Sequence, residues 1–160
     1  RKRKPKKVQS APERIPSLNK ADPDAYNVLF VDDNEINRKI GQAMLTNVSA
    51  PSLKLNFIES ASGQEAVDIR FNADRRIDVI LMDWHMPGMT GLEATVAIRT
   101  REKELALPRV PICCISAQVM DDPLTMTAQG MNCFLPKPFD RDQLVGTLRK
   151  LLGLSEKELD

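Results

Sequence analysis

Five polar residues, each placed directly at or after the end of an apolar run, could together perform phosphoryl chemistry: the Asp32-Asp33 pair, Asp83, Ser116 and Lys137. Three gathered carboxylates repel one another unless a cation intervenes. Mg²⁺ suits them, because it prefers carboxylate oxygen, keeps several waters and bridges readily to phosphate. Asp83 could then take up a phosphoryl group as an acyl phosphate, while the metal, the hydroxyl and the ammonium group hold its three oxygens.

These side chains meet only if the apolar runs before them are parallel strands, since the carboxyl ends of parallel strands converge at one edge of a sheet. The run from Val79 to Met82 is short and rich in strand formers, which indicates a strand buried on both faces. Pro87, Gly88 and Gly91 then predict a tight loop over its end. The predicted strands are residues 27–31, 53–58, 79–82, 110–115 and 132–135.

Helical patterns separate the strands. Asn34 is well placed as an N-cap for the first helix, in which Ile36, Ile40, Ala43 and Met44 recur at helical spacing. The predicted helices are residues 35–47, 62–71, 92–104, 119–129, which Gly130 would stop, and 140–152, which Asp140 would cap. Five strands alternating with five helices predict an α/β fold, a doubly wound parallel sheet with right-handed crossovers and helices on both faces.

Charge divides the chain into a tail and a globular part. Residues 1–20 hold eight Lys or Arg and one Glu, a net +7, which leaves 15 basic and 21 acidic residues, a net −6, in residues 21–160. We expect residues 1–25 to be a basic, disordered linker, residues 26–153 to form one domain, and residues 154–160 to be a C-terminal tail. The basic run could be a solvated tether or could bind nucleic acid, an anionic membrane or an import receptor.

Other compositional features indicate a cytoplasmic protein. The hydrophobic content of 42% is enough for a core. No run approaches the ~18 apolar residues of a membrane helix, and no signal-peptide pattern is visible. Cys113, Cys114 and Cys133 lack metal-site spacing and are expected to be reduced core thiols. The first residue is Arg rather than Met, which suggests a piece of a longer protein or a processed chain.

Four ordered motifs in residues 27–152 carry a family resemblance: VDDNEINRK at 31–39, LMDWHMPGMTG at 81–91, ISA at 115–117 and FLPKPF at 134–139. This region resembles the receiver domain of two-component response regulators, most closely the receivers attached to hybrid sensor histidine kinases. The resemblance implies a flavodoxin-like five-stranded sheet in the order 2-1-3-4-5. A bond such as Lys137-Pro138 is often cis in this family.

The resemblance also assigns roles at the acidic end of the strands. Asp83 would be the phosphoacceptor, taking the phosphoryl group from a phosphohistidine. Asp33 would bind Mg²⁺ directly together with Asp83, and Asp32 would hold a metal-bound water. The main-chain carbonyl of His85 would be a further metal ligand.

A second group of residues would respond to phosphorylation. Ser116 occupies the position of the switch hydroxyl, and Lys137 that of the family's lysine. Phe134 is similar to the switch aromatic that turns inward when the hydroxyl moves to the phosphoryl group. Trp84, beside the acceptor, should report metal or phosphoryl binding by its fluorescence.

Several functions remain open. The leading one is a phosphoacceptor module with only its own phosphorylation and dephosphorylation chemistry, within a hybrid histidine kinase or phosphorelay. Its expected partners are a histidine kinase domain or a histidine phosphotransfer protein, with no DNA, and it would be a monomer or weak dimer. The alternatives are a Mg²⁺-dependent phosphohydrolase with an Asp nucleophile, which steady turnover of a phosphate ester would favour, and a docking domain that works without phosphorylation.

Overall fold

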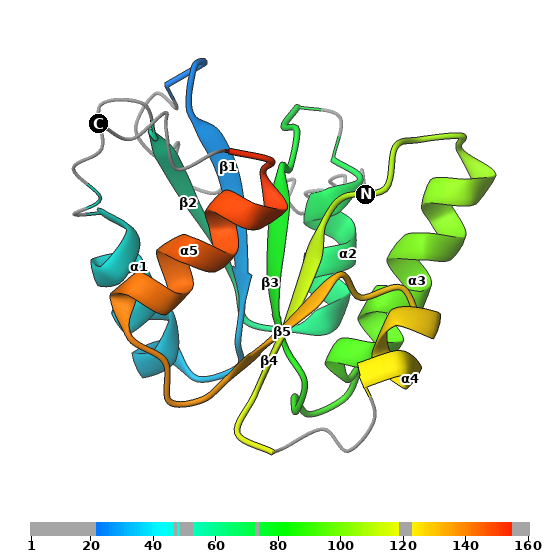
Figure 1. The fold of residues 1–160 in the computed structure, drawn as a ribbon. Helices are drawn as coiled ribbons and strands as arrows, with labels where there is room; N and C mark the ends of the chain where they lie inside the picture. The colour runs from blue at the N-terminus through cyan, green and yellow to red at the C-terminus, as the bar shows by residue number, and fades with distance from the viewer. Residues whose placement is uncertain (1–21, 47, 49–52, 73, 119–122, 155–160) are drawn as a thin grey trace, which may run out of the picture.

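The computed structural model describes residues 22–46, 48, 53–72, 74–118 and 123–154. Within these residues five strands alternate with five helices along the chain (Figure 1). In order, they are β1 (Tyr26–Val31), α1 (Glu35–Thr46), β2 (Leu55–Ser60), α2 (Gly63–Arg70), β3 (Val79–Asp83), α3 (Gly91–Glu104), β4 (Ile112–Ser116), α4 (Pro123–Ala128), β5 (Cys133–Pro136) and α5 (Arg141–Leu151).

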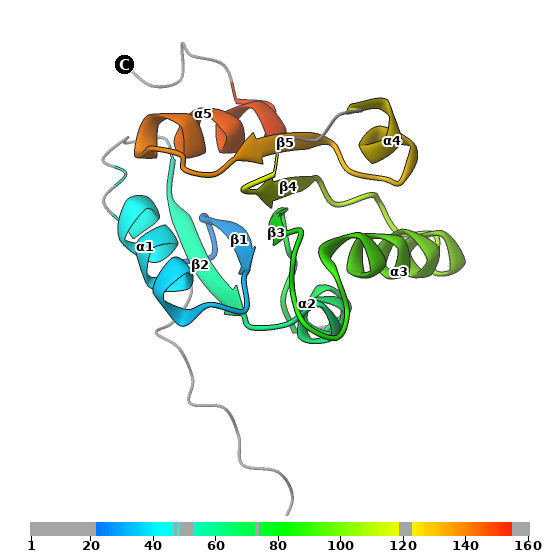
Figure 2. The same ribbon diagram turned by 90° about the horizontal axis from the view of Figure 1, so that it is seen from below.

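The strands form one parallel sheet in the order β2-β1-β3-β4-β5, which confirms the predicted topology. The pairing register aligns the carboxyl ends of neighbouring strands. Val31 pairs with Ser60 and Met82, and Ser116 pairs with Pro136. The residues that follow these strands therefore emerge together at one edge, which Figure 2 shows from below.

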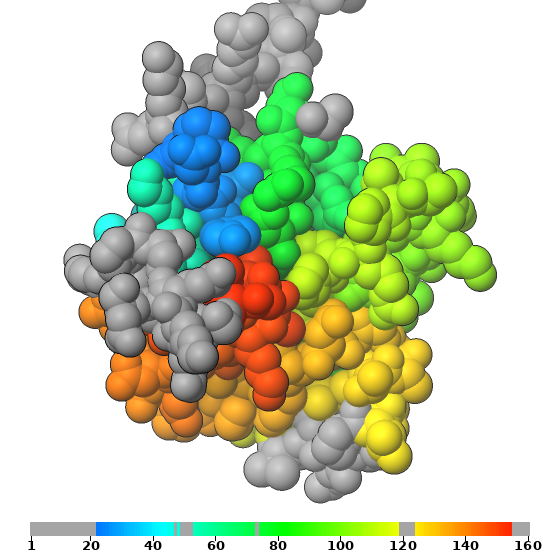
Figure 3. Space-filling model, turned by 45° about the horizontal axis from the view of Figure 1, so that its top comes forward, coloured from blue at the N-terminus to red at the C-terminus, as the bar shows by residue number. Residues whose placement is uncertain are grey.

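Helices cover both faces of the sheet (Figure 2). In β3, Ile80 and Met82 pack on one face with residues of α2, α3 and α4, while Val79 and Leu81 pack on the other with residues of α1 and α5. This alternation is the two-residue period of a strand buried on both sides. Figure 3 views the surface over the amino ends of the strands, where the C-terminal part of α5 (red) and the beginning of β1 (blue) are visible.

Side-chain caps set where the helices begin. The Asn34 side chain accepts a hydrogen bond from the Ile36 amide at 2.9 Å, so it caps α1 as predicted. The Asp140 side chain caps α5 in a reciprocal capping box with Gln143. Gly130 follows α4 with φ +101°, the left-handed conformation that ends a helix.

Two strands begin two residues later than predicted. β2 covers residues 55–60 instead of 53–58, because Glu59 and Ser60 continue the pairing with β1. β4 begins at Ile112, not at Val110, because Pro111 has no amide hydrogen and the Val110 amide donates to the Glu102 side chain. α4 covers residues 123–128, and the predicted start of this helix at residue 119 lies outside the described residues.

The apolar stripe predicted for α1 lies only partly on its buried face, since Met44 packs on the core. Ile36 is 66% exposed and Ile40 48% exposed, while Gly41 and Leu45 are buried. The spacing identified the helix, but spacing alone does not decide which of two apolar stripes faces the sheet. α1 therefore presents isoleucine side chains to solvent.

The end of the predicted linker is held against the domain. The Asp22 carboxylate accepts a hydrogen bond from the Lys54 ammonium group at 3.0 Å, and Ala25 is buried. Residues 1–21 and 155–160 lie outside the described residues. None of the helices in the described parts of the chain has the length and apolar character needed to cross a bilayer.

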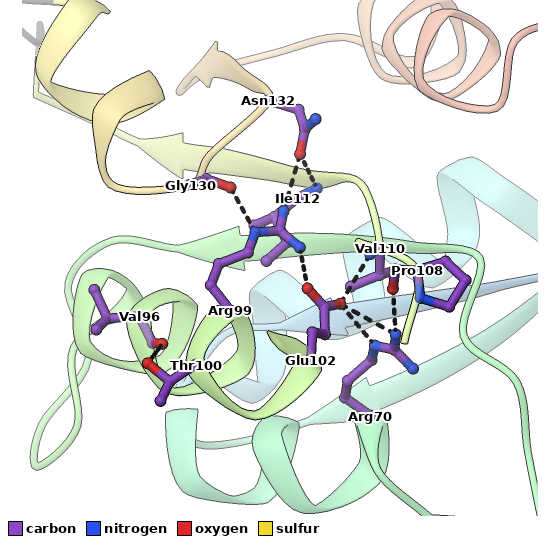
Figure 4. Close-up of polar contacts among 10 residues, drawn as sticks. All are labelled: Arg70, Val96, Arg99, Thr100, Glu102, Pro108, Val110, Ile112, Gly130 and Asn132. Atoms are coloured by element: carbon purple, nitrogen blue, oxygen red, sulfur yellow. Dashed lines mark hydrogen bonds and ion pairs between the residues drawn. The ribbon is translucent and has the colours of Figure 1, made fainter. Parts of the chain in front are cut away.

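A buried carboxylate joins four elements at the amino end of the sheet (Figure 4). Glu102 is 1% exposed and pairs with Arg70 of α2 at 3.1 Å and with Arg99 at 2.8 Å. The Arg99 guanidinium also donates to the Gly130 carbonyl and to the Asn132 side chain. The network therefore ties α2 and α3 to the segments that lead into β4 and β5.

Candidate functional site

The predicted site residues lie together at the carboxyl edge of the sheet. Asp32 and Asp33 follow β1, Asp83 and Ser116 close β3 and β4, and Lys137 follows β5. Carboxylate oxygens of the three aspartates all lie within 4.8 Å of one another. Lys137 contacts two of these carboxylates, so the ends of β1, β3 and β5 build one cluster, as the strand spacing predicted.

Asp32 is oriented by the start of α1. It is 1% exposed, and its carboxylate accepts hydrogen bonds from the Asn34 amide at 2.9 Å and from the Asn37 side chain at 3.1 Å. Arg38 donates to the Asp32 carbonyl at 2.8 Å and lies 3.5 Å from Glu59. The sequence reasoning assigned no role to Asn37 or Arg38, although both lie in the first turn of the helix after the acidic pair. Their position in this first turn was the signal that could have indicated contacts with the acidic pair.

Lys137 joins two of the acids. Its ammonium group lies 3.1 Å from Asp32 and 3.3 Å from Asp83. Its amide donates to the Ser116 carbonyl at 2.8 Å, which fixes the start of the side chain against β4. The Lys137-Pro138 peptide bond is cis.

The electrostatics leave the cluster short of positive charge. Burial and the nearby Asp32 carboxylate raise the pKa of Asp83 above its ordinary value, and Lys137 only partly opposes this. Burial alone would lower the pKa of Lys137, but its hydrogen bond to Asp32 and the two carboxylates raise it, so the lysine stays charged. Three carboxylates and one ammonium group carry a net −2, which a divalent cation would balance.

A close contact positions the backbone of the acceptor loop. The Gly91 amide donates to the Trp84 carbonyl at 3.0 Å, and a Cβ atom on Gly91 would lie 2.1 Å from the Asp83 carbonyl oxygen. Only glycine fits there. Gly88 has φ +75°, a conformation that also favours glycine. The two glycines let the loop turn back onto the strand end.

The remaining predicted residues surround the cluster. Ser116 is buried, and its hydroxyl accepts a hydrogen bond from the Gln118 amide at 3.1 Å. Phe134 and Trp84 are partly buried against the core shared with α2 and α3. The His85 residue is exposed. The switch roles of Ser116 and Phe134 concern a change on phosphorylation and stay predictions.

Comparison with known proteins identifies the family. The model of the response regulator receiver domain matches residues 28–149. Hybrid signal transduction histidine kinase L of Dictyostelium discoideum is 36% identical over 126 residues, covering 77% of this chain and 7% of that protein. The sensor protein GacS of Pseudomonas syringae is 33% identical over 132 residues, covering 82% of this chain and 14% of that protein. The chain thus spans a small fraction of these relatives.

Solved structures agree with the sequence relatives. The receiver domain of Ssk1, crystallised with the histidine phosphotransfer protein Ypd1 of Saccharomyces cerevisiae, superposes with a TM-score of 0.67 at 28% identity, covering 79% of this chain and 88% of that one. The receiver domain of the Arabidopsis thaliana histidine kinase CKI1, complexed with Mg²⁺ and BeF₃⁻, gives 0.65 at 30% identity, covering 80% and 90%. On its fold, its acidic cluster and these matches, the chain belongs to the response regulator receiver domain family.

Proposed function

We propose that this chain is the phosphoacceptor domain of a two-component phosphorelay and takes a phosphoryl group from a phosphohistidine onto Asp83. The observation that carries the proposal is the Lys137 ammonium group, which contacts Asp83 and Asp32 from a third strand. This arrangement places a carboxylate nucleophile inside a site that neutralises negative charge.

The side chains have distinct tasks. A carboxylate oxygen of Asp83 attacks phosphorus, an acyl phosphate forms, and the bond from phosphorus to the histidine nitrogen breaks. The Lys137 ammonium group and the Ser116 hydroxyl each stabilise one phosphoryl oxygen. Asp33 and Asp83, with the main-chain carbonyl of His85, would bind Mg²⁺, and Asp32 would hold a water on it. When bound, the metal supplies the positive charge that the cluster lacks.

The partner would be a histidine kinase domain or a histidine phosphotransfer protein. Two relatives are a hybrid histidine kinase and a sensor protein, and the similar Ssk1 receiver was crystallised with such a phosphotransfer protein. The exposed Ile36 and Ile40 of α1 follow the exposed Asp33 closely along the chain, so an apolar surface for docking begins beside the site. A cytoplasmic location follows from this role.

The two alternative functions have less support. A phosphohydrolase of the type considered has its Asp nucleophile on the first strand with a second Asp two residues later, whereas here Asp32 and Asp33 are adjacent and Asp83 closes β3. A docking domain without phosphorylation would give no reason for a buried, partly uncompensated Asp83. Both alternatives predict that the protein does not retain a phosphoryl group on this residue.

The direct test is incubation of the protein with a small phosphodonor and Mg²⁺, followed by mass spectrometry of the intact chain. We expect one added phosphoryl group that is lost in alkali, that requires Mg²⁺, and that is absent from Asp83→Asn. The Asp142→Asn variant, which changes an exposed aspartate on α5, is the matched control and should be labelled like the wild type. Labelling of Asp83→Asn at the wild-type level would refute the assignment.

Metal binding can be followed through Trp84, which adjoins Asp83. We expect titration with Mg²⁺ to change tryptophan fluorescence and Asp33→Ala to weaken the apparent affinity by at least about 10- to 100-fold, the loss that removal of a residue supporting a metal ligand already causes. Asp68→Ala, on the exposed side of α2, should leave the titration unchanged. An unchanged affinity in Asp33→Ala would exclude that carboxylate as a ligand.

The raised pKa of Asp83 predicts how stability depends on pH without metal. Since the folded state binds this proton more tightly than the unfolded chain, ionised Asp83 destabilises the fold. The destabilisation by Asp83 is absent below pH 3.8, the ordinary pKa of an aspartate, and it is complete once the pH exceeds the raised pKa of Asp83 in the folded state. In EDTA, we expect Asp83→Asn to be more stable than wild type near neutral pH, with a difference that shrinks towards about pH 4 in urea unfolding.

A further inference from the structure

Two cysteines lie opposite each other in the sheet, outside the phosphoacceptor cluster. Cys113 of β4 and Cys133 of β5 are paired in register, and both pack on the core shared with α1 and α5. Paired residues of neighbouring strands lie about 4.8 Å apart, inside the Cα separation of about 4.4–6.8 Å that a disulfide spans. Cys114 packs in the core on the opposite face of the sheet. Only the first two thiols can therefore meet.

The two thiols of the pair differ in access and in charge. Cys113 is fully buried, whereas Cys133 is partly exposed on the edge strand. The neighbouring Cys113 side chain lowers the pKa of Cys133, burial opposes this, and the positive charge of Lys150 adds to the lowering. The Cys113 thiol itself donates a hydrogen bond to the Cys114 carbonyl at 3.6 Å. Burial raises the pKa of Cys114 to about 12, helped by Asp83. Cys133 therefore combines access with stabilisation of its thiolate, the conditions for a reactive cysteine.

We propose that Cys133 and Cys113 form a peroxide-reactive dithiol, in which Cys133 is oxidised first and Cys113 closes a disulfide. A partly exposed thiolate next to a second, shielded thiol is the arrangement of a redox-sensing pair. The buried partner needs no access to solvent, because its target is the oxidised sulfur of Cys133.

The chemistry balances with hydrogen peroxide as the oxidant. The Cys133 thiolate attacks one peroxide oxygen, an S–O bond forms, the O–O bond breaks and the departing hydroxide becomes water. Cys113 sulfur then attacks the sulfenic acid, an S–S bond forms, the S–O bond breaks, and the hydroxide leaves as water with the Cys113 proton. Two thiols have lost two electrons and one peroxide has become two waters.

The site is independent of Asp83, so it stands or falls separately from the proposed phosphoryl chemistry. Its position still matters to that chemistry, because Cys133 immediately precedes Phe134 and Cys113 lies three residues before Ser116. A disulfide here would fasten β5 to β4 beside both predicted switch residues. Oxidation would thereby limit movement of the edge strand.

The test treats the folded full chain with hydrogen peroxide, blocks the remaining thiols and digests the protein with trypsin and with a protease that cleaves before aspartate. These cuts separate residues 110–120, with Cys113 and Cys114, from residues 122–139, with Cys133. We expect the two peptides to be joined, with a mass two hydrogens below their sum, and to separate on reduction. Absence of the joined pair from the oxidised folded protein would overturn the proposal.

Single-cysteine substitutions test which cysteine is oxidised first and which one closes the disulfide. Cys114→Ser should keep the joined peptides, and Cys113→Ser should lose them and leave a sulfenic acid on Cys133 that a dione reagent traps. In the unmodified folded chain, alkylation of Cys133 should be at least about tenfold faster than that of Cys113, a comparison that needs no variant. Joined peptides that persist in Cys113→Ser, or faster alkylation of Cys113, would refute the assignment.

Discussion

Replacing Lys137 with Met will slow phosphoryl uptake from a small phosphodonor about 100- to 1,000-fold, the loss seen when one donor to a developing negative charge is removed. The Lys137 ammonium group is the cation that touches both Asp83 and Asp32 in the described cluster. Without it, the three carboxylates lose their internal counter-charge, so the pKa of Asp83 rises further and the incoming phosphoryl oxygens lose a partner. Single-turnover labelling with saturating Mg²⁺ measures the rate.

Two further variants make this test specific. Lys103→Met changes an exposed lysine of α3 and should label at the wild-type rate. Lys137→Arg keeps the charge but replaces a compact ammonium group with a wider planar one, so it should restore only part of the rate. A rate within about twofold of wild type for Lys137→Met would contradict a role in neutralising the transferred group.

Replacing Glu102 with Ala will lower the free energy of unfolding by about 3–5 kcal/mol, because it leaves two arginines, whose side chains are only 11% and 12% exposed, without their carboxylate partner. Arg70 and Arg99 both pair with this carboxylate, and the Val110 amide donates to it at 2.9 Å. All three groups lose an acceptor, and the carboxylate that they share is 1% exposed. The corresponding fall in Tm is roughly 10 °C or more for a domain of this size.

The neighbouring Glu104 provides the control for this prediction. Glu104 is exposed near the end of the same helix, so Glu104→Ala should change the free energy of unfolding by less than about 0.5 kcal/mol. Urea unfolding of both variants separates the loss of a buried ion network from a change in helix propensity. Equal stabilities for the two variants would show that the Glu102 network does not stabilise the fold.

The topology and the acidic cluster could be predicted because both follow from local patterns. Short apolar runs that alternate with helical periods lead to a parallel sheet, and the sheet then brings Asp83, the acidic pair and Lys137 to one edge. The family resemblance added the strand order and the roles. None of these steps needed a side-chain contact.

The rest depends on packing that periodicity does not encode. Nothing in the spacing of Arg70, Arg99 and Glu102 distinguishes a buried ion network from three charges on solvated helix faces. Likewise, Ile36 and Ile40 fit an inward stripe as well as an outward one until the sheet on which α1 packs is known. Pairing across strands, as between Cys113 and Cys133, requires the register itself.

Helix α3 is held at both ends, and this constrains its length. Its first residue, Gly91, abuts the acceptor backbone, and Arg99 and Glu102 near its other end meet partners that lead into β4 and β5. Its 14 residues span about 21 Å, so the length of the helix fixes the distance between these two sets of contacts. Inserting a single residue between the two sets of contacts would turn the later side chains by about 100°, so the contacts at one end of the helix would be lost.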